Sequence, residues 1–307
     1  MEAAICYSMN HSQTHIIIRD IREVTISDIR KLLGSKSIDL LAGCPPCQGF
    51  SSVRRLNRKR SARDPRNNLI LDYLRFVKAL RPKTIMLENV PALQDYYLFK
   101  SLVKSLQELG YKIDHGIVNV ADYGVPQRRK RLVLVGSLLG PIVIAPSPNL
   151  RKTVRDIIGD MESIEKTADP IHKIVAKHKL HIEAMIKMIP HDGGSRTNLP
   201  EKHKLECHKK LNVGFNDIYG RLKWDDVSST ITGGCLNPSK GRFLHPEQDR
   251  AITAREAALL QTFSKDYRFP TNLSKDKLAL LIGNALPPEF SRIQSSNILS
   301  HLKKYHG

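Results

Sequence analysis

The sequence GCPPCQGFS at residues 43–51 places Cys44 and Cys47 on either side of a Pro-Pro pair. Cysteines at this spacing can form a redox couple, supply half of a zinc site, or include a nucleophile. As a nucleophile, Cys47 would benefit from Arg54 and Arg55, because nearby positive charge favours the thiolate, which is the attacking species. The spacing alone leaves the three interpretations open.

The rest of the chain gives little support to zinc or redox chemistry. A zinc site needs two more ligands, but Cys207 and His208 are adjacent, Cys235 stands alone, and there is no second C-x-x-C. A thioredoxin-like couple opens a helix, whereas residues 48–66 are rich in Ser and Arg and resemble a turn. We therefore expect a nucleophile and no bound metal.

A carboxylate follows a second apolar run, in the sequence ENV at residues 88–90. A carboxyl group buried there could stay protonated near neutral pH and hydrogen-bond an acceptor. The alternative is that Glu88 simply caps a following helix.

Short apolar runs alternate with amphipathic segments over the first 136 residues. The runs predicted as buried strands are 15–19, 37–43, 83–89 and 131–136. The segments predicted as helices are 68–80 and 98–110, with two more helical regions at 253–263 and from 274 to the end. This alternation predicts an α/β fold with a mostly parallel sheet, in which the loops after residues 43 and 88 face the same site.

Lys and Arg outnumber Asp and Glu by 49 to 30, giving a net charge of +19. Such a field favours a polyanion, most simply nucleic acid, although a merely basic surface would have the same composition. Five scattered cysteines argue against a disulfide framework. No apolar run approaches the ~20 residues that span a bilayer, and no signal peptide is evident. We expect a cytoplasmic protein with no membrane partner.

Five short motifs occur in one order along the chain: Pro45-Pro46-Cys47-Gln48, ENV, QRRKR at 127–131, TAREAALLQTF at 253–263, and GNALPP at 283–288. Their order resembles that of the DNA cytosine-5 methyltransferases, over almost the whole length. The resemblance implies a Rossmann-like class I methyltransferase core with a smaller target-recognition lobe. It divides the chain into a catalytic core at 1–151, a target-recognition region at 152–250, and C-terminal helices at 251–307 that return to the core.

The resemblance also implies a mechanism. Cys47 would add to C6 of cytosine, and C5, thereby activated, would take a methyl group from S-adenosylmethionine. Glu88 would stabilise the ring through N3, Arg129 would bond O2 of the base, and Arg131 would support the loop. The base must first be flipped out of double-stranded DNA. Phosphate contacts or salt bridges remain the simpler alternative for the two arginines.

By the same resemblance, cofactor-side positions correspond to Asp20, Ile21, Pro46, Leu69 and Asn284. Asp20 could instead be an ordinary turn residue, and Ile21 and Leu69 could be core.

DNA recognition is expected from the target-recognition region. Arg196, Asn216 and Arg221 lie near glycines there, and Arg and Asn side chains can read base edges in the major groove. The basic segment 54–66, with Arg54 and Arg55, would close over phosphates. Surface turns and a solvated charge run are the alternatives.

One family feature is missing, because the chain contains no G-x-G. The family begins with a strand, a Gly-rich turn (D-L-F-x-G-x-G), a helix and a second strand, whereas this chain starts near a helix at 2–10. A truncated gene, a split enzyme completed by an N-terminal fragment, and a decayed DNA-binding remnant are the three explanations. We expect the chain alone to bind S-adenosylmethionine poorly and to methylate slowly or not at all. The expected biological role is restriction–modification or a related epigenetic role.

Overall fold

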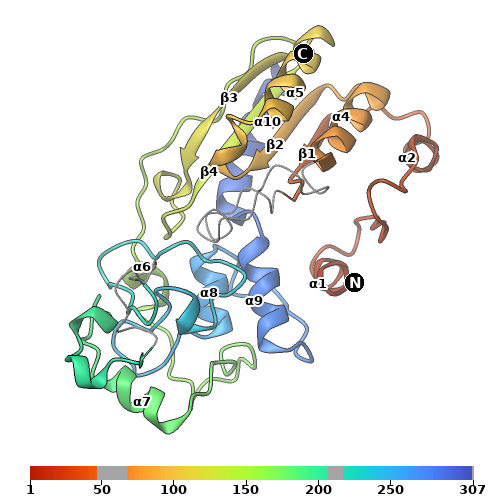
Figure 1. The fold of residues 1–307 in the computed structure, drawn as a ribbon. Helices are drawn as coiled ribbons and strands as arrows, with labels where there is room; N and C mark the ends of the chain where they lie inside the picture. Colours follow the sequence, from red (N-terminus) through yellow and green to blue (C-terminus); the bar gives the residue numbers. More distant parts are fainter. Residues whose placement is uncertain (47–67, 207–216, 306–307) are drawn as a thin grey trace. The chain divides into compact units, whose positions relative to one another are not determined.

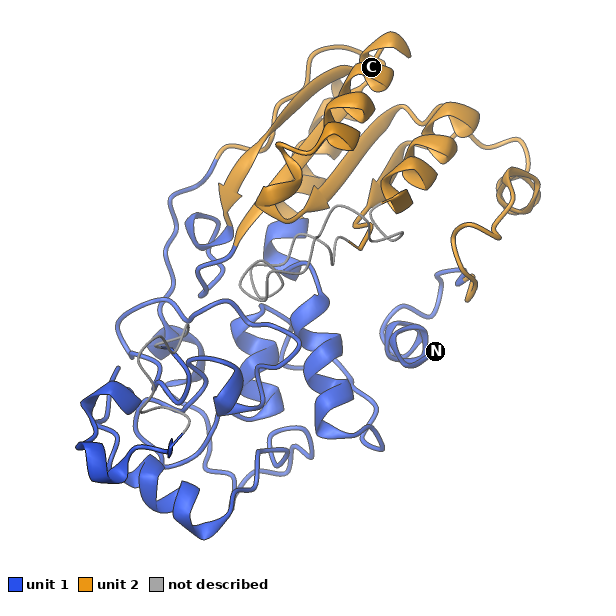
Figure 2. Cartoon of the chain, in the orientation of Figure 1, with its two compact units in different colours: residues 1–16, 120–129, 147–291 blue, residues 17–119, 130–146, 292–307 orange. Residues whose placement is uncertain are grey.

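The computed structural model describes residues 1–46, 68–206 and 217–305. The chain forms two compact units (Figure 2). Unit 1 comprises residues 1–16, 120–129 and 147–291, and unit 2 comprises residues 17–119, 130–146 and 292–307. Residues 251–291 therefore group with the 152–250 segment, and only 292–307 belong to the unit that holds the sheet, so this division differs from the predicted boundaries.

Unit 2 contains a four-stranded sheet in the order β1 (Leu40–Gly43), β2 (Thr84–Asn89), β4 (Lys130–Ser137), β3 (Lys112–Asn119) (Figure 1). β1 and β2 are parallel, but β4 runs antiparallel to both β2 and β3. The expectation of a mostly parallel sheet is therefore wrong for the described strands. β3 and β4 are separated by only ten residues, too few for the crossover that parallel strands require.

The strand predictions contain two errors: one strand was missed, and one predicted strand is irregular in the structure. β3 was not predicted, because its exposed and half-buried residues include Lys112, Asp114 and His115 and form no apolar run. The run 15–19 was predicted as a strand but is irregular, and Ile18 is 52% exposed. A strand needs a neighbour for its backbone groups, and no described segment pairs with this run.

Helices α4 (Leu69–Leu80) and α5 (Tyr97–Glu108) cover one face of the sheet, as their apolar spacing predicts. Tyr73 and Val77 of α4 and Phe99 of α5 pack with Leu87 and Leu134 of the strands in one hydrophobic core. The short helix α2 (Ile26–Leu33) begins with a Thr25 capping box. Near the C-terminus, His301 of α10 (Pro288–Lys304) hydrogen-bonds Ser137 of β4 at 2.8 Å.

Unit 1 is built from short helices and irregular segments. Its helices are α1 (Glu2–Ser8), α6 (Val154–Ile158), α7 (Leu180–Lys187), α8 (Ala254–Leu260) and α9 (Lys275–Asn284). Every residue of α8 is buried, and its apolar side chains pack with Cys6 of α1 and Cys235 in a second core. The strand-poor character predicted for 150–250 is confirmed, since the described part of this region forms only isolated bridges.

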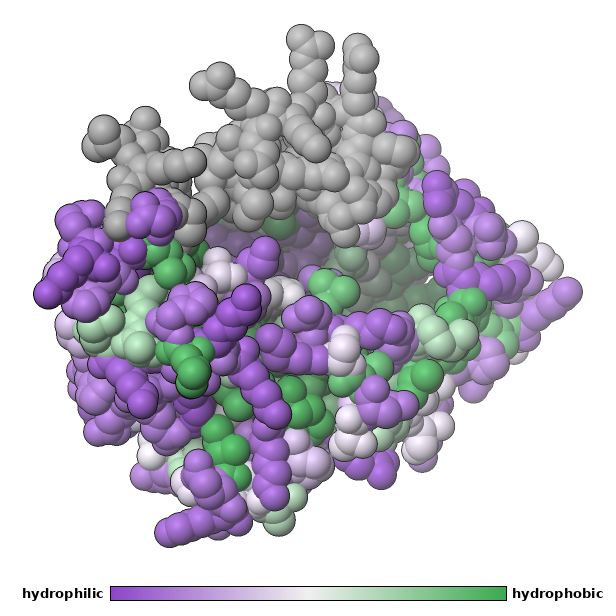
Figure 3. Space-filling model, turned by 60° about the horizontal axis from the view of Figure 1, so that its bottom comes forward, coloured by the Kyte–Doolittle hydropathy of each residue, from purple (hydrophilic) through white to green (hydrophobic). Residues whose placement is uncertain are grey.

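The face shown in Figure 3 is largely hydrophilic, with hydrophobic residues in smaller patches. None of the helices in the described ranges has the length and apolar character needed to cross a bilayer.

Candidate active site

Glu88 and Arg131 form an ion pair on the sheet of unit 2. Arg131 Nε donates to Glu88 Oε1 at 2.7 Å, and the two side chains are only 15% and 11% exposed. Glu88 lies in β2 opposite Val133 of β4, two residues from Arg131, so side-chain alternation puts Glu88 and Arg131 on the same face. Leu87 and Leu134 point to the other face, into the core beneath α4 and α5.

Asn89, the last residue of β2, is hydrogen-bonded to the backbone of the segment that precedes Cys47 in the sequence. Asn89 Nδ2 donates to the carbonyl oxygen of Pro45 at 2.9 Å, and its Oδ1 accepts from the backbone N–H of Val90 at 2.8 Å. Asn89 is buried, so these bonds are shielded from water. Cys47 itself lies outside the described residues. The structure thus connects Pro45, which precedes the expected nucleophile in the sequence, to the end of β2 next to Glu88.

Tyr73 supports β1 from the opposite face. A Cβ atom on Gly43 would lie 2.6 Å from the Tyr73 ring, so the ring occupies the space that a side chain would need. The Tyr73 hydroxyl donates to the carbonyl oxygen of Met86 in β2 at 3.1 Å. Gly43 thereby lets α4 approach β1 closely.

Cys44 is a poor candidate for the attacking thiol of a redox couple. Burial of its sulfur, followed by the nearby Glu88 carboxylate, raises the pKa of the Cys44 thiol to about 12. Cys44 as a residue nevertheless keeps exposed surface. A thiol that is so weakly ionised reacts slowly with disulfides.

The arginines of QRRKR have different surroundings. Arg129 is buried, and its Nη1 donates to the carbonyl oxygens of Ile231 at 2.8 Å and Gly283 at 3.1 Å, while Nη2 donates to that of Ala285 at 3.3 Å. Arg131, expected to support the loop, is the arginine beside Glu88, and Arg129, expected to reach the base, supports unit 1. Burial lowers the pKa of Arg131, and the Glu88 carboxylate opposes this shift.

Gln127 was not singled out from the sequence, although it belongs to the same motif. It is fully buried; its Nε2 donates to the carbonyl oxygen of Leu260 at 3.2 Å, and its Oε1 accepts from the N–H of Ile231 at 3.1 Å. Alternate residues of the motif, Gln127 and Arg129, therefore join α8, α9 and the 231 segment. The alternation Q-x-R-x-R could have indicated that Gln127 has the same kind of structural role as the arginines of the motif.

Gly283 allows a close backbone approach at the end of α9. A Cβ atom there would collide with the carbonyl group of Thr232 and the backbone nitrogen of Gly233. We expect Gly283→Ala to lower the free energy of unfolding by about 2–3 kcal/mol, because backbone cannot move aside as a flexible side chain can. Thermal melts should show a loss of several degrees.

The matched control is Gly116→Ala in β3, where the nearest atom to an added Cβ is 3.9 Å away. Equal melting temperatures for the two variants would contradict the assignment of Gly283 to a close packing contact.

The residues expected on the cofactor side are placed as follows. The Asp20 carboxylate is paired with Arg22, whose Nε donates to Oδ1 at 2.9 Å, and Ile21, Pro46 and Leu69 are exposed or half-buried. The Arg22 hydrogen bond holds the pKa of Asp20 well below its usual range. These four residues belong to unit 2, and the exposed Asn284 belongs to unit 1.

Two of the residues expected to contact DNA are buried. Arg221 has no exposed side-chain surface, and Arg196 is 4% exposed as a residue, so neither can reach a base edge in this structure. Both were predicted from their proximity to glycines, which carries no information about burial. Arg54, Arg55 and Asn216 lie outside the described residues.

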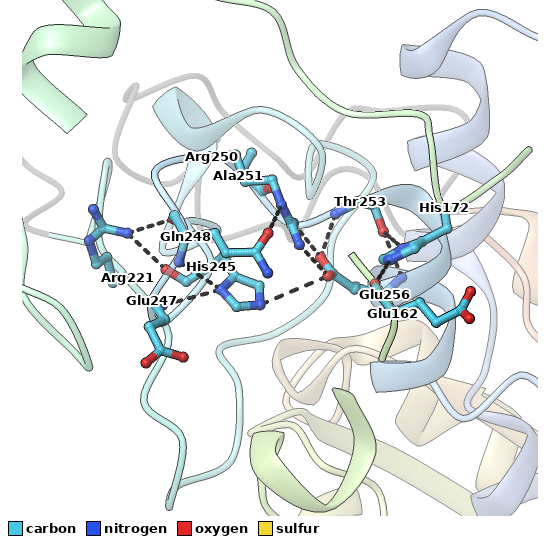
Figure 4. Close-up of polar contacts among 10 residues, drawn as sticks. All are labelled: Glu162, His172, Arg221, His245, Glu247, Gln248, Arg250, Ala251, Thr253 and Glu256. Atoms are coloured by element: carbon cyan, nitrogen blue, oxygen red, sulfur yellow. Dashed lines mark hydrogen bonds and ion pairs between the residues drawn. The ribbon is translucent and has the colours of Figure 1, made fainter. Parts of the chain in front are cut away.

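A buried polar network crosses unit 1 (Figure 4). Arg250 binds Glu256 through two hydrogen bonds of 2.7 and 2.8 Å, and Glu256 Oε2 accepts from the N–H of Thr253 at 2.7 Å. The Thr253 hydroxyl contacts His172 Nδ1 at 2.8 Å, and His245 Nε2 lies 3.9 Å from Glu256 Oε1. Burial alone would raise the pKa of Glu256, but the hydrogen bonds and charge of Arg250 outweigh it and lower that pKa.

His245 makes the stability of this network depend on pH. Burial, opposed by Glu256, lowers the pKa of His245 to about 4, from about 6.5 when unfolded. The unfolded chain therefore binds the extra proton between pH 6.5 and 4, and the stability contributed by neutral His245 is lost as pH falls through this window. We expect a loss on the order of 2–3 kcal/mol from this group.

The control is His245→Asn, since the asparagine oxygen can replace Nδ1 as acceptor for the N–H groups of Glu247 and Gln248, which lie 3.2 and 3.0 Å away. Melting temperature between pH 7 and 4.5 should fall less steeply in this variant than in the unmodified chain. Parallel curves would show that another group controls this window.

The described residues include no cluster of three or more His, Cys, Asp or Glu side chains arranged to hold a metal ion.

Comparisons with known proteins identify relatives along the whole chain. Residues 1–299 match the family model described as C-5 cytosine-specific DNA methylase. The chain is 36% identical over 313 residues to the Type II methylase M.HgiDII of Herpetosiphon aurantiacus, covering 98% of this chain and 86% of that protein. It is 29% identical to the Type II methyltransferase M1.HphI of Haemophilus parahaemolyticus, covering 95% and 77% of the two chains. The crystal structure of the S. pombe Dnmt2 methyltransferase has the same fold, with a TM-score of 0.65 at 20% identity, over 97% of this chain and 87% of that one.

Proposed function

Because the chain belongs to the C-5 cytosine-specific DNA methylase family, we propose that it methylates C5 of cytosine in DNA through a covalent adduct with Cys47. The observation that supports this most directly is the Glu88–Arg131 pair, held on the sheet beside the turn that leads to Cys47. A nucleophile, a carboxyl group and a guanidinium are the groups that this reaction requires.

In the proposed reaction the Cys47 thiolate forms a bond to C6 of the flipped cytosine, and the electron pair of the C5–C6 double bond moves onto the ring. A protonated Glu88 donates a hydrogen bond to N3, where negative charge develops, and Arg131 donates one to O2. Here Arg131 takes the role that the sequence resemblance gave to Arg129, since the carbonyl contacts of Arg129 lie within unit 1. After C5 is methylated, a base removes its proton, and the re-formed double bond expels the Cys47 thiolate.

The methyl group would come from S-adenosylmethionine. Ile21, Pro46 and Leu69 of unit 2 leave apolar surface accessible, which suits the adenine ring. The Asp20 carboxylate could accept a hydrogen bond from the cofactor only after its ion pair with Arg22 is broken. These residues would bind and orient the cofactor.

We further propose that the substrate is double-stranded DNA and that the chain serves restriction–modification. The relatives in Herpetosiphon and Haemophilus are named as type II enzymes, and a net charge of +19 favours a phosphate backbone.

A second candidate is an enzyme that needs a complementing N-terminal fragment, or a DNA-binding remnant. The observation in its favour is that β1 has a hydrogen-bonded neighbour on one side only, β2, in the described sheet. An added strand could pair with the other edge of β1.

The test is transfer of a labelled methyl group from S-adenosylmethionine to unmethylated duplex DNA, followed by bisulfite mapping. The assay is run with and without a fragment carrying D-L-F-x-G-x-G. We expect 5-methylcytosine at one short sequence. Methylation of adenine, or no transfer in either condition, would refute the proposed activity, and transfer only with the fragment would support the second candidate.

A further inference from the structure

Cys44 and Glu88 are neighbours by the register of the sheet. Gly43 of β1 pairs with Leu87 of the parallel strand β2, so the next residues along, Cys44 and Glu88, also lie side by side. Gly43 and Leu87 face α4, as the Tyr73 ring over Gly43 shows. Because side chains alternate between faces, Cys44 and Glu88 share the opposite face with Arg131.

Burial raises the pKa of the Cys44 thiol, and the Glu88 carboxylate beside it raises that pKa further. One side of that carboxylate is already fixed by Arg131 Nε at 2.7 Å. The thiol therefore supplies a second fixed neighbour to the group that is to face the base.

We propose that Cys44 is a positioning residue for Glu88, whose thiol donates to the carboxylate and, with Arg131, holds it in one orientation. The effect of Cys44 on the reaction rests on the proposed function, but the contact between Cys44 and Glu88 does not.

The contact is tested without any enzymatic turnover. In a Cys47→Ser background, only Cys44 remains in the tryptic peptide 37–54, and its alkylation by iodoacetamide at pH 8.5 can be followed by mass spectrometry. Removing the neighbouring negative charge with Glu88→Gln should speed alkylation of Cys44 at least about threefold, because the thiolate is then less disfavoured.

Glu108→Gln is the matched control, since this residue of α5 is 63% exposed and forms only a long ion pair, 3.9 Å, with the exposed Lys104. It should leave the alkylation rate unchanged. An equal rate in the Glu88→Gln variant and its parent would refute the contact.

The positioning role is tested by kinetics. Cys44→Ala should lower kcat about three- to tenfold, the loss expected for one modest hydrogen bond, with the KM values for DNA and cofactor unchanged. Cys44→Ser, which keeps a donor, should restore kcat to within about twofold of the unmodified chain. In a Glu88→Asp background, which retains a carboxylate displaced from its native position, the alanine change should have less effect than in the unmodified chain.

An unchanged kcat in Cys44→Ala, a failure of serine to rescue it, or fully additive losses would each overturn the positioning role. These outcomes differ from failure of the proposed function, in which the unmodified chain transfers no methyl group while the alkylation experiment still reports the contact.

Discussion

Cys47→Ser is expected to abolish methyl transfer, lowering kcat by at least about four orders of magnitude. Serine has nearly the same size, but an alcohol is far less acidic than a thiol, so it provides almost no anionic nucleophile at neutral pH. Binding of DNA should survive, because the lost step follows binding. The measurement is transfer of a labelled methyl group, with DNA binding measured in parallel. Both are measured with the N-terminal fragment if the unmodified chain needs it for turnover, and without it otherwise.

Cys44→Ser is the control for this variant, because it makes the same chemical change three residues away and should keep most of the activity. Residual activity above about 1% in Cys47→Ser would mean that another group attacks the base, and the assignment of Cys47 would be wrong.

Arg221→Ala should cause the largest loss of stability, about 3–5 kcal/mol. The guanidinium of Arg221 donates to four carbonyl oxygens, those of Ile186, Ile189, His245 and Gln248, at 2.7 to 3.1 Å, and to the Asp249 carboxylate at 2.5 Å. Its removal would leave these acceptors without their donor in a buried space. Lysine would not rescue the loss, because it lacks the planar fork that reaches several acceptors together.

Urea unfolding and thermal melts measure this loss. Arg155→Ala is the control, since the Arg155–Asp225 pair is 53% and 72% exposed and should contribute less than about 1 kcal/mol. If Arg221→Ala instead kept its stability and changed the methylated sequence, the original prediction of a DNA-reading arginine would be correct.

The sequence predicted most of the elements that have a strong local signal. The helices at 69–80 and 97–108 and the strands at 40–43, 84–89 and 130–137 follow from apolar periodicity. β3 was missed, because a strand with few fully buried residues lacks an apolar run. The run 15–19 has strand composition but no described partner, and pairing is a property of the whole sheet that composition cannot supply.

Residue type was predicted better than residue role. The order of motifs led to Glu88 and to Arg129 and Arg131 of QRRKR, but not to which of these two arginines contacts the carboxylate. The difference between the two arginines arises because the chain crosses from unit 1 to unit 2 between residues 129 and 130. The motif alone does not show where this crossing occurs. Likewise Arg196 and Arg221 were assigned to DNA because they lie near glycines and arginine can read base edges, whereas both are buried. A sequence does not reveal which arginines are buried and hydrogen-bonded to backbone carbonyl oxygens instead of water.

Covalent attack by Cys47 on cytosine can be tested by trapping the adduct on duplex DNA that contains 5-fluorocytosine. Fluorine at C5 blocks the final elimination, so the enzyme should remain attached to the DNA in denaturing gels when S-adenosylmethionine is present, with the fragment added if turnover requires it. We expect this adduct for the unmodified chain and none for Cys47→Ser. An adduct that persists in Cys47→Ser, or no adduct in an active preparation, would contradict this expectation.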